Sequence, residues 1–207
     1  MCSIVGSYDR NKVKELIELN RYRGEFSHSV SVFCDMQLAY CKQMSGPLDL
    51  SKHHLPSGYI ICHQQAPTDV HVGSGTHPAM HEGHMLWHNG IIKEDCVKAL
   101  REELNDIATW DTHLLLRKLI KDGAAGLNEI DGTFSCVWYH DGMLYYFRNE
   151  ISPMFIDMED MTISSTKFDG EDVISLPPNQ IMAFGQINTV ADQTFNTVNN
   201  PYYFGAT

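Results

Sequence analysis

A cysteine stands directly after the initiator methionine, in the opening residues MCSIVG. Because cysteine is small, we expect the methionine to be removed, which would leave Cys2 with a free α-amine beside its thiol. An α-amine titrates near ~7.7–8.0 and a thiol near ~8.5, so the amine could accept the thiol proton close to neutral pH. The position of Cys2 therefore predicts a nucleophile that carries its own general base.

An asparagine-glycine pair, Asn89-Gly90, ends the apolar run GHMLWHN. Such a pair most often forms only a turn. At the end of a strand, however, a side-chain amide and a glycine N–H can point at the same oxygen atom, which is what an oxyanion hole requires. Taken alone, the pair is therefore compatible with an oxyanion hole, with a simple turn as the more common alternative.

Other reactive side chains give weaker predictions. Pro78, Gly83 and the apolar run that follows favour a loop and a strand over a helix, so the nearby histidines are better explained as loop or pocket-lining residues than as metal ligands. Cys62 and His63 are adjacent on a predicted strand and would point to opposite faces, so they cannot form a catalytic pair. The histidines in question are His77, His81, His84 and His88.

The composition predicts a globular protein without a nucleic-acid or membrane surface. The chain has 207 residues, of which 43% are hydrophobic, and a formal net charge of -11. That charge disfavours nucleic acid and anionic lipid, and no apolar run approaches the roughly 20 residues of a membrane span. The six cysteines form no CxxC pair, and no signal peptide is visible, so we expect reduced thiols, a cytoplasmic location and no metal or cofactor.

The pattern of apolar residues predicts an α+β fold in a single domain that spans 1–207. Helices are expected at 11–24, 95–107 and 111–123, the second with Leu100, Leu104 and Ile107 on its apolar face. Strands are expected at 4–8, 28–41, 59–64, 83–89, 161–168 and 179–185, with a hairpin over 132–149. Helices in the middle of the chain between groups of strands favour stacked layers over alternating βαβ units.

Eight short segments, taken in order, resemble the class II glutamine amidotransferase domains, which are N-terminal-nucleophile hydrolases. The segments are MCSIVG, RYRGEFS, CHQQAPT, THP, GHMLWHNGII, TWDTHLLLRKL, DGTFSCVWYHDGMLYYFRNEISP and ISSTKF. The resemblance covers nearly the whole chain. It implies a four-layer αββα sandwich built on two stacked antiparallel sheets.

The resemblance also implies the chemistry. Cys2 would attack the side-chain amide of glutamine to give a thioester and ammonia, and water would then release glutamate. Asn89 and Gly90 would hold the tetrahedral oxyanion. The ammonia would pass to a synthetase on a separate chain, since no acceptor-site motif such as an SGG.DS phosphate loop is present.

The same resemblance assigns residues that bind the substrate. Asp111 would bind the α-ammonium of glutamine, although it could instead cap the helix that begins there. Arg23 and Gly24 match an RG pair that lines the pocket. His63 and Gln65 lie in the segment where the family has an arginine that pairs with the glutamine carboxylate, and the neutral amide of Gln65 offers a weaker partner.

The substitutions relative to the family leave two interpretations open. Ser3, Glu25, Phe26 and His77 also differ from the family pattern, whereas the nucleophile and the oxyanion pair are kept. The first interpretation is a divergent glutaminase that supplies ammonia to a partner. The alternative is a catalytically degenerate module with a structural or protein-interaction role, to which the aromatic tail Tyr202-Tyr203-Phe204 could contribute a docking surface.

Overall fold

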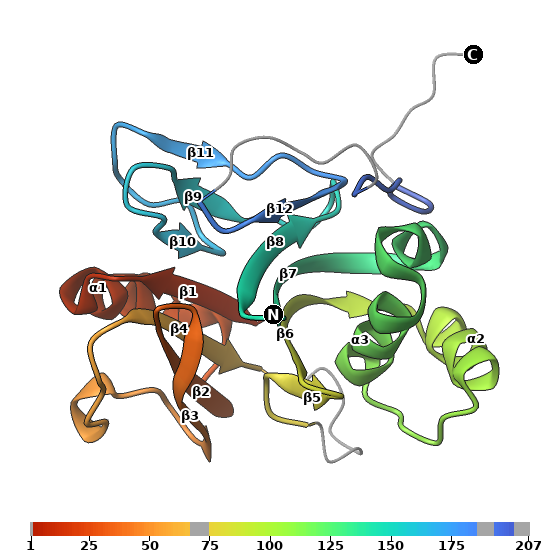
Figure 1. Cartoon of the computed structure of the whole chain (residues 1–207), viewed down its shortest axis with the longest axis horizontal. Coiled ribbons are helices and arrows are strands. Elements are labelled where there is room, and N and C mark those ends of the chain that lie inside the picture. Colours follow the sequence, from red (N-terminus) through yellow and green to blue (C-terminus); the bar gives the residue numbers. More distant parts are fainter. Residues whose placement is uncertain (1, 67–74, 186–192, 201–207) are drawn as a thin grey trace.

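Two antiparallel sheets lie face to face in the computed structural model, which describes residues 2–66, 75–185 and 193–200 (Figure 1). The first sheet has the strand order β11-β9-β10-β1-β4-β2-β3. Its strands are β1 (Ser3–Ser7), β2 (Ser27–Cys34), β3 (Gln37–Ser45), β4 (Tyr59–Gln65), β9 (Phe155–Asp157), β10 (Ile163–Ser164) and β11 (Val173–Ser175). The second sheet has the order β12-β8-β7-β6-β5. Its strands are β5 (Ala79–His81), β6 (His84–Ile92), β7 (Gly132–His140), β8 (Met143–Arg148) and β12 (Gln180–Ala183).

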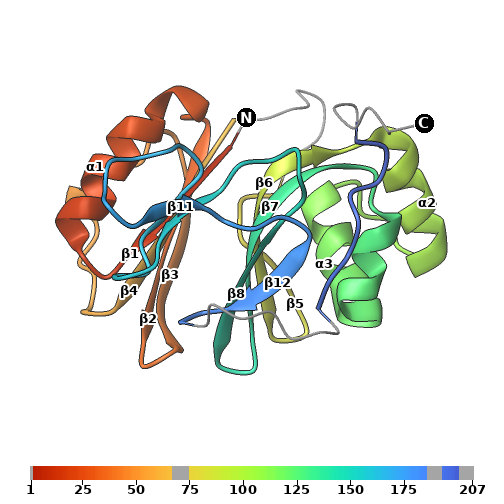
Figure 2. The same ribbon diagram turned by 90° about the horizontal axis from the view of Figure 1, so that it is seen from above.

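Helices cover the outer face of each sheet. Helix α1 (Arg10–Asn20) packs on β1 and β4, whereas α3 (Asp111–Asp122) packs on β5 and β6 and also against α2 (Glu94–Leu104). Figure 2 shows these four layers in sequence, with α1 at the left and α3 and α2 at the right. The expected α+β sandwich of αββα type is therefore confirmed. Three short 3-10 helices join the elements: η1 (Arg21–Arg23), η2 (Leu50–Lys52) and η3 (Gly123–Glu129).

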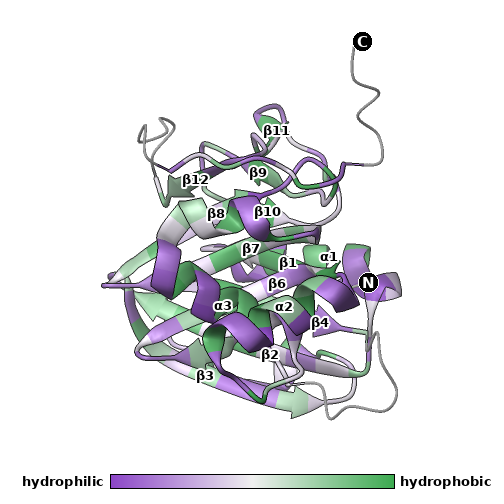
Figure 3. Ribbon diagram, turned by 90° about the vertical axis from the view of Figure 1, so that its right-hand side faces the viewer, coloured by the Kyte–Doolittle hydropathy of each residue, from purple (hydrophilic) through white to green (hydrophobic). Residues whose placement is uncertain are grey.

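Alternation along the strands builds three apolar cores. Successive side chains on a strand point to opposite faces, so Ile4 lies between the sheets while Val5 packs under α1. In the second sheet, Trp87 lies between the sheets and Leu86 packs under α3. Figure 3 looks onto α2 and α3, whose ribbons carry both hydrophilic and hydrophobic residues, as expected for helices that bury one face. Within the described ranges, no helix is long and apolar enough to cross a membrane.

Some boundaries differ from the sequence-based prediction. Helix α1 ends at Asn20. Helix α2 ends at Leu104 because Asn105 adopts a left-handed conformation at φ 47°, and its N–H donates to carbonyl oxygens of the last turn. The predicted placement of Ile107 on a helical apolar face is therefore wrong, and its side chain is 91% exposed. Of the strand expected over 161–168, only β10 forms. The short strands β5, β9 and β11 were not predicted, since each has only three residues.

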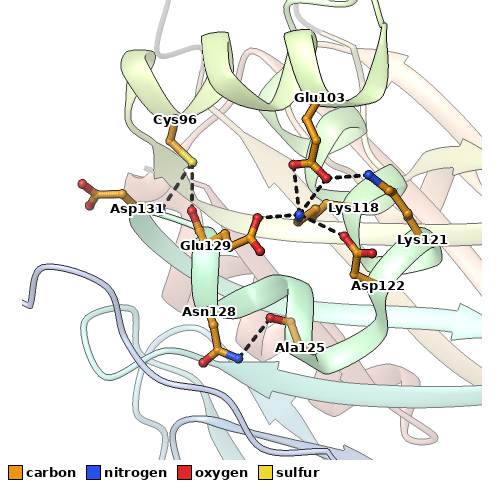
Figure 4. A network of polar contacts seen from close by, with 9 residues as sticks. All are labelled: Cys96, Glu103, Lys118, Lys121, Asp122, Ala125, Asn128, Glu129 and Asp131. Atoms are coloured by element: carbon orange, nitrogen blue, oxygen red, sulfur yellow. Dashed lines mark hydrogen bonds and ion pairs between the residues drawn. The ribbon is translucent and has the colours of Figure 1, made fainter.

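A buried lysine ties together the helices of the outer layer (Figure 4). The Lys118 side chain is 2% exposed, and its Nζ lies 2.8 Å from Glu103, 2.9 Å from Asp122 and 2.6 Å from Glu129. Burial alone would lower the pKa of Lys118, but the hydrogen bonds to these three carboxylates raise it above its ordinary value. The network joins α2, α3 and η3, and so fixes the helix whose first turn reaches the candidate site.

Candidate active site

Cys2 lies at the start of β1, with its side chain on the same side of the strand as Ile4. Strand β1 pairs with β4 in the register Ser3 to Gln64, and the Ile4 N–H donates to Ser165 Oγ at 2.9 Å. The Cys2 thiol is 6% exposed and points its S–H at the Ala66 carbonyl oxygen, 3.7 Å away. Burial raises the pKa of this thiol, so an adjacent base is needed to form the thiolate near neutral pH.

A small cavity of about 40 Å³ lies beside the thiol. It brings together Cys2, the end of β4, the end of β6 and the first turn of α3. The cavity is therefore a junction between the two sheets and the outer helix layer, and it is closed enough to hold little more than one water molecule. Its lining residues are Cys2, Gln65, Ala66, His77, His88, Gly90, Trp110, Asp111 and Thr112.

Gly90 lies on the cavity wall in a position that only glycine can occupy. A Cβ atom built there would lie 1.9 Å from the Thr133 carbonyl oxygen and 2.6 Å from His88 Nε2. Real Cβ atoms do not approach backbone this closely, so the pairing of β6 with β7 depends on the missing side chain. The glycine backbone is thereby exposed to the cavity.

The Asn89 side chain is held by serine hydroxyl groups beside the cavity and is not among its lining residues. Its Nδ2 donates to Ser135 Oγ and to Ser165 Oγ, each at 3.3 Å. The backbone carbonyl oxygen of Asn89 accepts from Ser152 Oγ at 2.9 Å. Because Ser165 also accepts from the Ile4 N–H, one hydroxyl oxygen links the asparagine amide to the strand that begins at the nucleophile.

Asp111 is the first residue of α3 and lines the cavity. Its Oδ1 accepts from the Thr112 N–H at 2.7 Å, and its Oδ2 accepts from the Ile92 N–H at 3.2 Å. The carboxylate therefore binds the start of its own helix and the end of β6. It is also the one Asp, Glu, Lys or Arg side chain among the described lining residues.

Both polar atoms of the Gln65 side chain form hydrogen bonds within the protein. Its Oε1 accepts from Ser27 Oγ at 3.0 Å, and its Nε2 donates to the Gly75 carbonyl oxygen at 3.2 Å. Gly24 packs against the same strand end, where an added Cβ would lie 2.3 Å from the Ala66 nitrogen. These contacts fix the part of the cavity wall that is formed by the end of β4.

Arg23 acts beside the cavity and does not line it. Its Nε donates to Thr166 Oγ1 at 2.9 Å, and its Nη2 donates to the Ser165 carbonyl oxygen at 3.3 Å. Its positive charge lowers the pKa of the Cys2 thiol and so opposes part of the effect of burial. Arg23 therefore supports the segment that holds Asn89 and stabilises the thiolate from a distance.

Three buried histidines gather around Thr112. The rings of His63 and His77 are stacked with centroids 3.8 Å apart, and both His77 Nε2 and His88 Nδ1 lie 3.1 Å from Thr112 Oγ1. Burial lowers the pKa of His63 to about 3 and holds that of His77 well below its ordinary value. His63 donates from Nε2 to the His88 carbonyl oxygen at 3.0 Å, which leaves its Nδ1 without a partner in the described part of the chain.

The four histidines that lie close together in the sequence fall into two groups in the structure. His77 and His88 line the cavity, whereas His81 and His84 lie at the far end of the β5–β6 hairpin. Within residues 2–66, 75–185 and 193–200, no group of three side chains could hold a metal ion.

Trp110 and Thr112 line the cavity, although the sequence analysis did not assign them to it. Their position next to Asp111 in the sequence was the available signal. The tail with its three aromatic residues lies outside the described residues.

Comparisons with known proteins identify the fold. No model of a protein family and no curated protein matches this sequence. Among solved structures, the chain is similar to glutamine phosphoribosylpyrophosphate amidotransferase from B. subtilis, with a TM-score of 0.63 and 16% identity over 91% of this chain and 49% of that chain. A structure described as the allosteric regulatory enzyme of purine biosynthesis gives a TM-score of 0.61 at 15% identity, over 88% of this chain and 46% of that one.

A third structure is matched over its full length. It is a glutamine aminotransferase class-II domain protein from Silicibacter pomeroyi, with a TM-score of 0.51 and 13% identity over 94% of this chain and 100% of that chain. The present chain spans about half the length of the first two structures. Together these similarities show that the chain has the fold of a class II glutamine amidotransferase domain, which is an N-terminal-nucleophile hydrolase fold. The resemblance seen in the sequence motifs is confirmed at this level.

Proposed function

We propose that this chain is a glutaminase of the amidotransferase type, which releases ammonia from a side-chain amide through Cys2 for use by a synthetase on another chain. The observation that carries the proposal is that Cys2, Gly90 and Asp111 line one cavity, although they come from β1, β6 and α3. A nucleophile, a backbone N–H and an anion then stand around the space where an amide and its distant ammonium would bind. We expect this to occur in a reducing compartment such as the cytoplasm, because all six cysteines are unpaired.

The proposed reaction needs only groups at this site. The α-amine of Cys2, once it is the first residue, accepts the thiol proton, and the sulfur forms a bond to the amide carbon. The Gly90 N–H and the Asn89 amide stabilise the oxyanion. The carbon–nitrogen bond then breaks, the α-ammonium returns its proton to the leaving nitrogen, and ammonia departs. Water, activated by the same amine, hydrolyses the thioester to a carboxylic acid and restores the thiol.

The size of the cavity adds a requirement to this proposal. A cavity of about 40 Å³ is far smaller than the roughly 300–1,000 Å³ of ordinary ligand sites. Substrate entry must therefore move part of the wall. Trp110 is only partly buried and packs edge-on against the buried His77 with ring centroids 5.1 Å apart, so Trp110 is the expected moving part.

One feature favours a second candidate, a non-catalytic interaction module. Nδ2 of Asn89 and both polar side-chain atoms of Gln65 already have hydrogen-bond partners inside the protein, so these groups of the proposed oxyanion and carboxylate sites are engaged internally. In that case Cys2 would be a buried core thiol, and the fold would serve as a scaffold.

Intact mass and amide turnover distinguish the two candidates. We expect natively expressed protein to lack Met1 and to release glutamate from glutamine, while Cys2→Ala should lose this release entirely. Cys34→Ala is the matched control, because that thiol lies at the end of β2 away from Gln65, donates to the Ser57 carbonyl oxygen, and should leave turnover unchanged when removed. Retained methionine, with no release of ammonia from any amide, would favour the scaffold.

A further inference from the structure

The charge of the cavity gives information about the substrate. Apart from the histidines and the nucleophile Cys2, Asp111 is the one titratable side chain among the described lining residues, and other polar atoms of the lining come from Gln65, Thr112 and Trp110. Glutamine carries an ammonium and a carboxylate on the same carbon atom. A site with one carboxylate and no cation matches the ammonium and opposes the carboxylate.

All fifteen lysines and arginines of the sequence lie within the described residues, since none falls in residues 67–74, 186–192 or 201–207. None of them lines this cavity. Arg23, whose charge acts on the Cys2 thiol, donates to Thr166 Oγ1 and to the Ser165 carbonyl oxygen beside the cavity. The lining of the cavity in this structure therefore supplies no lysine or arginine to pair with a substrate carboxylate.

Among the other groups that could become positive, His77 is held neutral. Burial, together with the neighbouring imidazoles of His63 and His88, keeps the pKa of His77 well below its ordinary value. The α-amine of Cys2 must be neutral to act as the base. Gln65, which lines the same cavity, offers an amide whose oxygen and nitrogen are bonded to Ser27 and Gly75.

We infer that the preferred substrate is a primary carboxamide that carries an amine at its far end and no carboxylate beside that amine, so that the ammonium pairs with Asp111 while Cys2 attacks the amide carbon. The indole of Trp110 lines the same cavity and adds a π-face on which a desolvated ammonium can rest. This inference rests on the proposed function and narrows the class of amide on which it acts.

Three matched amides test the inference. They are glutamine, 4-aminobutanamide, which is glutamine without its carboxylate, and 5-amino-5-oxopentanoate, which is glutamine without its ammonium. For protein that lacks Met1, we expect kcat/KM for 4-aminobutanamide to exceed that for glutamine by about 10-fold or more, with the third amide slowest. Equal or faster turnover of glutamine would overturn the inference while leaving the proposed hydrolase function intact.

The affinity of the amides for the Cys2→Ala variant measures the same preference without turnover. By calorimetry, 4-aminobutanamide should bind more tightly than glutamine, and Asp111→Asn in this background should remove the difference. Glutamine binding as tightly as 4-aminobutanamide would refute the charge argument, whereas binding without any turnover by the wild type would refute the hydrolase alone.

A gain-of-charge variant provides the converse test. Gln65→Arg adds a cation to the lining of the cavity, and we expect it to lower the KM for glutamine and to reverse the order of the two amine-bearing amides. Gln37→Arg is the control, since Gln37 is exposed on β3 and adds the same charge away from the site. If both variants leave the order unchanged while Gln65→Arg folds with wild-type stability, the carboxylate is not the discriminating group.

Discussion

Replacing Lys118 by methionine should destabilise the protein because it leaves three carboxylates around a buried position. The ammonium is 2% exposed and contacts Glu103, Asp122 and Glu129 at 2.6–2.9 Å. Methionine fills similar space but supplies no charge, so the three carboxylates would repel one another. We therefore expect the helices α2 and α3 and the segment η3 to separate more easily.

The magnitude follows from burial of the partners. Removing one member of a fully buried ion pair costs roughly 3–5 kcal/mol. Here the carboxylate side chains are 33%, 31% and 64% exposed, so water can solvate them in part. We expect a loss of about 2–3 kcal/mol in the free energy of unfolding, which for a chain of this size lowers Tm by roughly 5–10 °C.

Urea unfolding followed by tryptophan fluorescence measures this loss. The control is Lys121→Met, whose ammonium is 49% exposed and contacts Glu103 alone at 2.6 Å, so it should cost less than about 1 kcal/mol. A Lys118→Met protein within about 0.5 kcal/mol of the Lys121→Met protein would show that the network contributes little to stability. A second readout is turnover: loosening α3 should displace Asp111, so KM should rise more than kcat falls.

Three further predictions concern the site and the acid stability. Gly90→Ala should lose about 2–4 kcal/mol of unfolding free energy in urea, since its Cβ would lie 1.9 Å from a carbonyl oxygen of the next strand; wild-type stability would show that this close approach does not constrain the strand pairing. Asn89→Ala should reduce kcat by roughly 10²–10³ with little change in KM, and turnover within threefold of the wild type would remove it from the oxyanion hole. Hydrogen bonds from the Ala108 N–H and from Arg117 lower the pKa of Asp106 to about 2, so its stabilisation is present above pH ~4 and is lost as pH falls toward 2. The difference in stability between wild type and Asp106→Asn should therefore shrink over that range, and a constant difference would mean that the carboxylate charge is not the cause.

Much of the architecture could be predicted because, in long segments, the period of the apolar residues indicates both the type of element and the face that is buried. The runs that became α1, α3, β4, β6 and the β7–β8 hairpin have clear apolar periods, and the structure contains each of them. Boundaries set by a single residue were missed, as where Asn105 ends α2 early and leaves Ile107 exposed. Three-residue strands have too few positions to show a period, which explains why β5, β9 and β11 were not foreseen.

The arrangement of the reactive side chains could be predicted less completely than the positions of the helices and strands. Cys2, Gly90 and Asp111 could be named from position and motif, and they do line one cavity. The sequence could not show that the Asn89 amide is bonded to Ser135 and Ser165, because the three residues are far apart along the chain. Which hydrogen-bonding groups remain free is a property of packing and not of residue type.

By itself, the sequence determined the alternation of buried and exposed side chains, and with it the two sheets, their covering helices and a cysteine at the start of the first strand. Only the tertiary structure decided which charges share the cavity with that cysteine. The stacking of the layers brings Asp111, His77 and His88 to the cavity beside the thiol, whereas Arg23 bonds Thr166 next to it. The physical reason is that side-chain alternation is a local property, whereas the electrostatics of a site depends on contacts between segments that meet only when the layers pack.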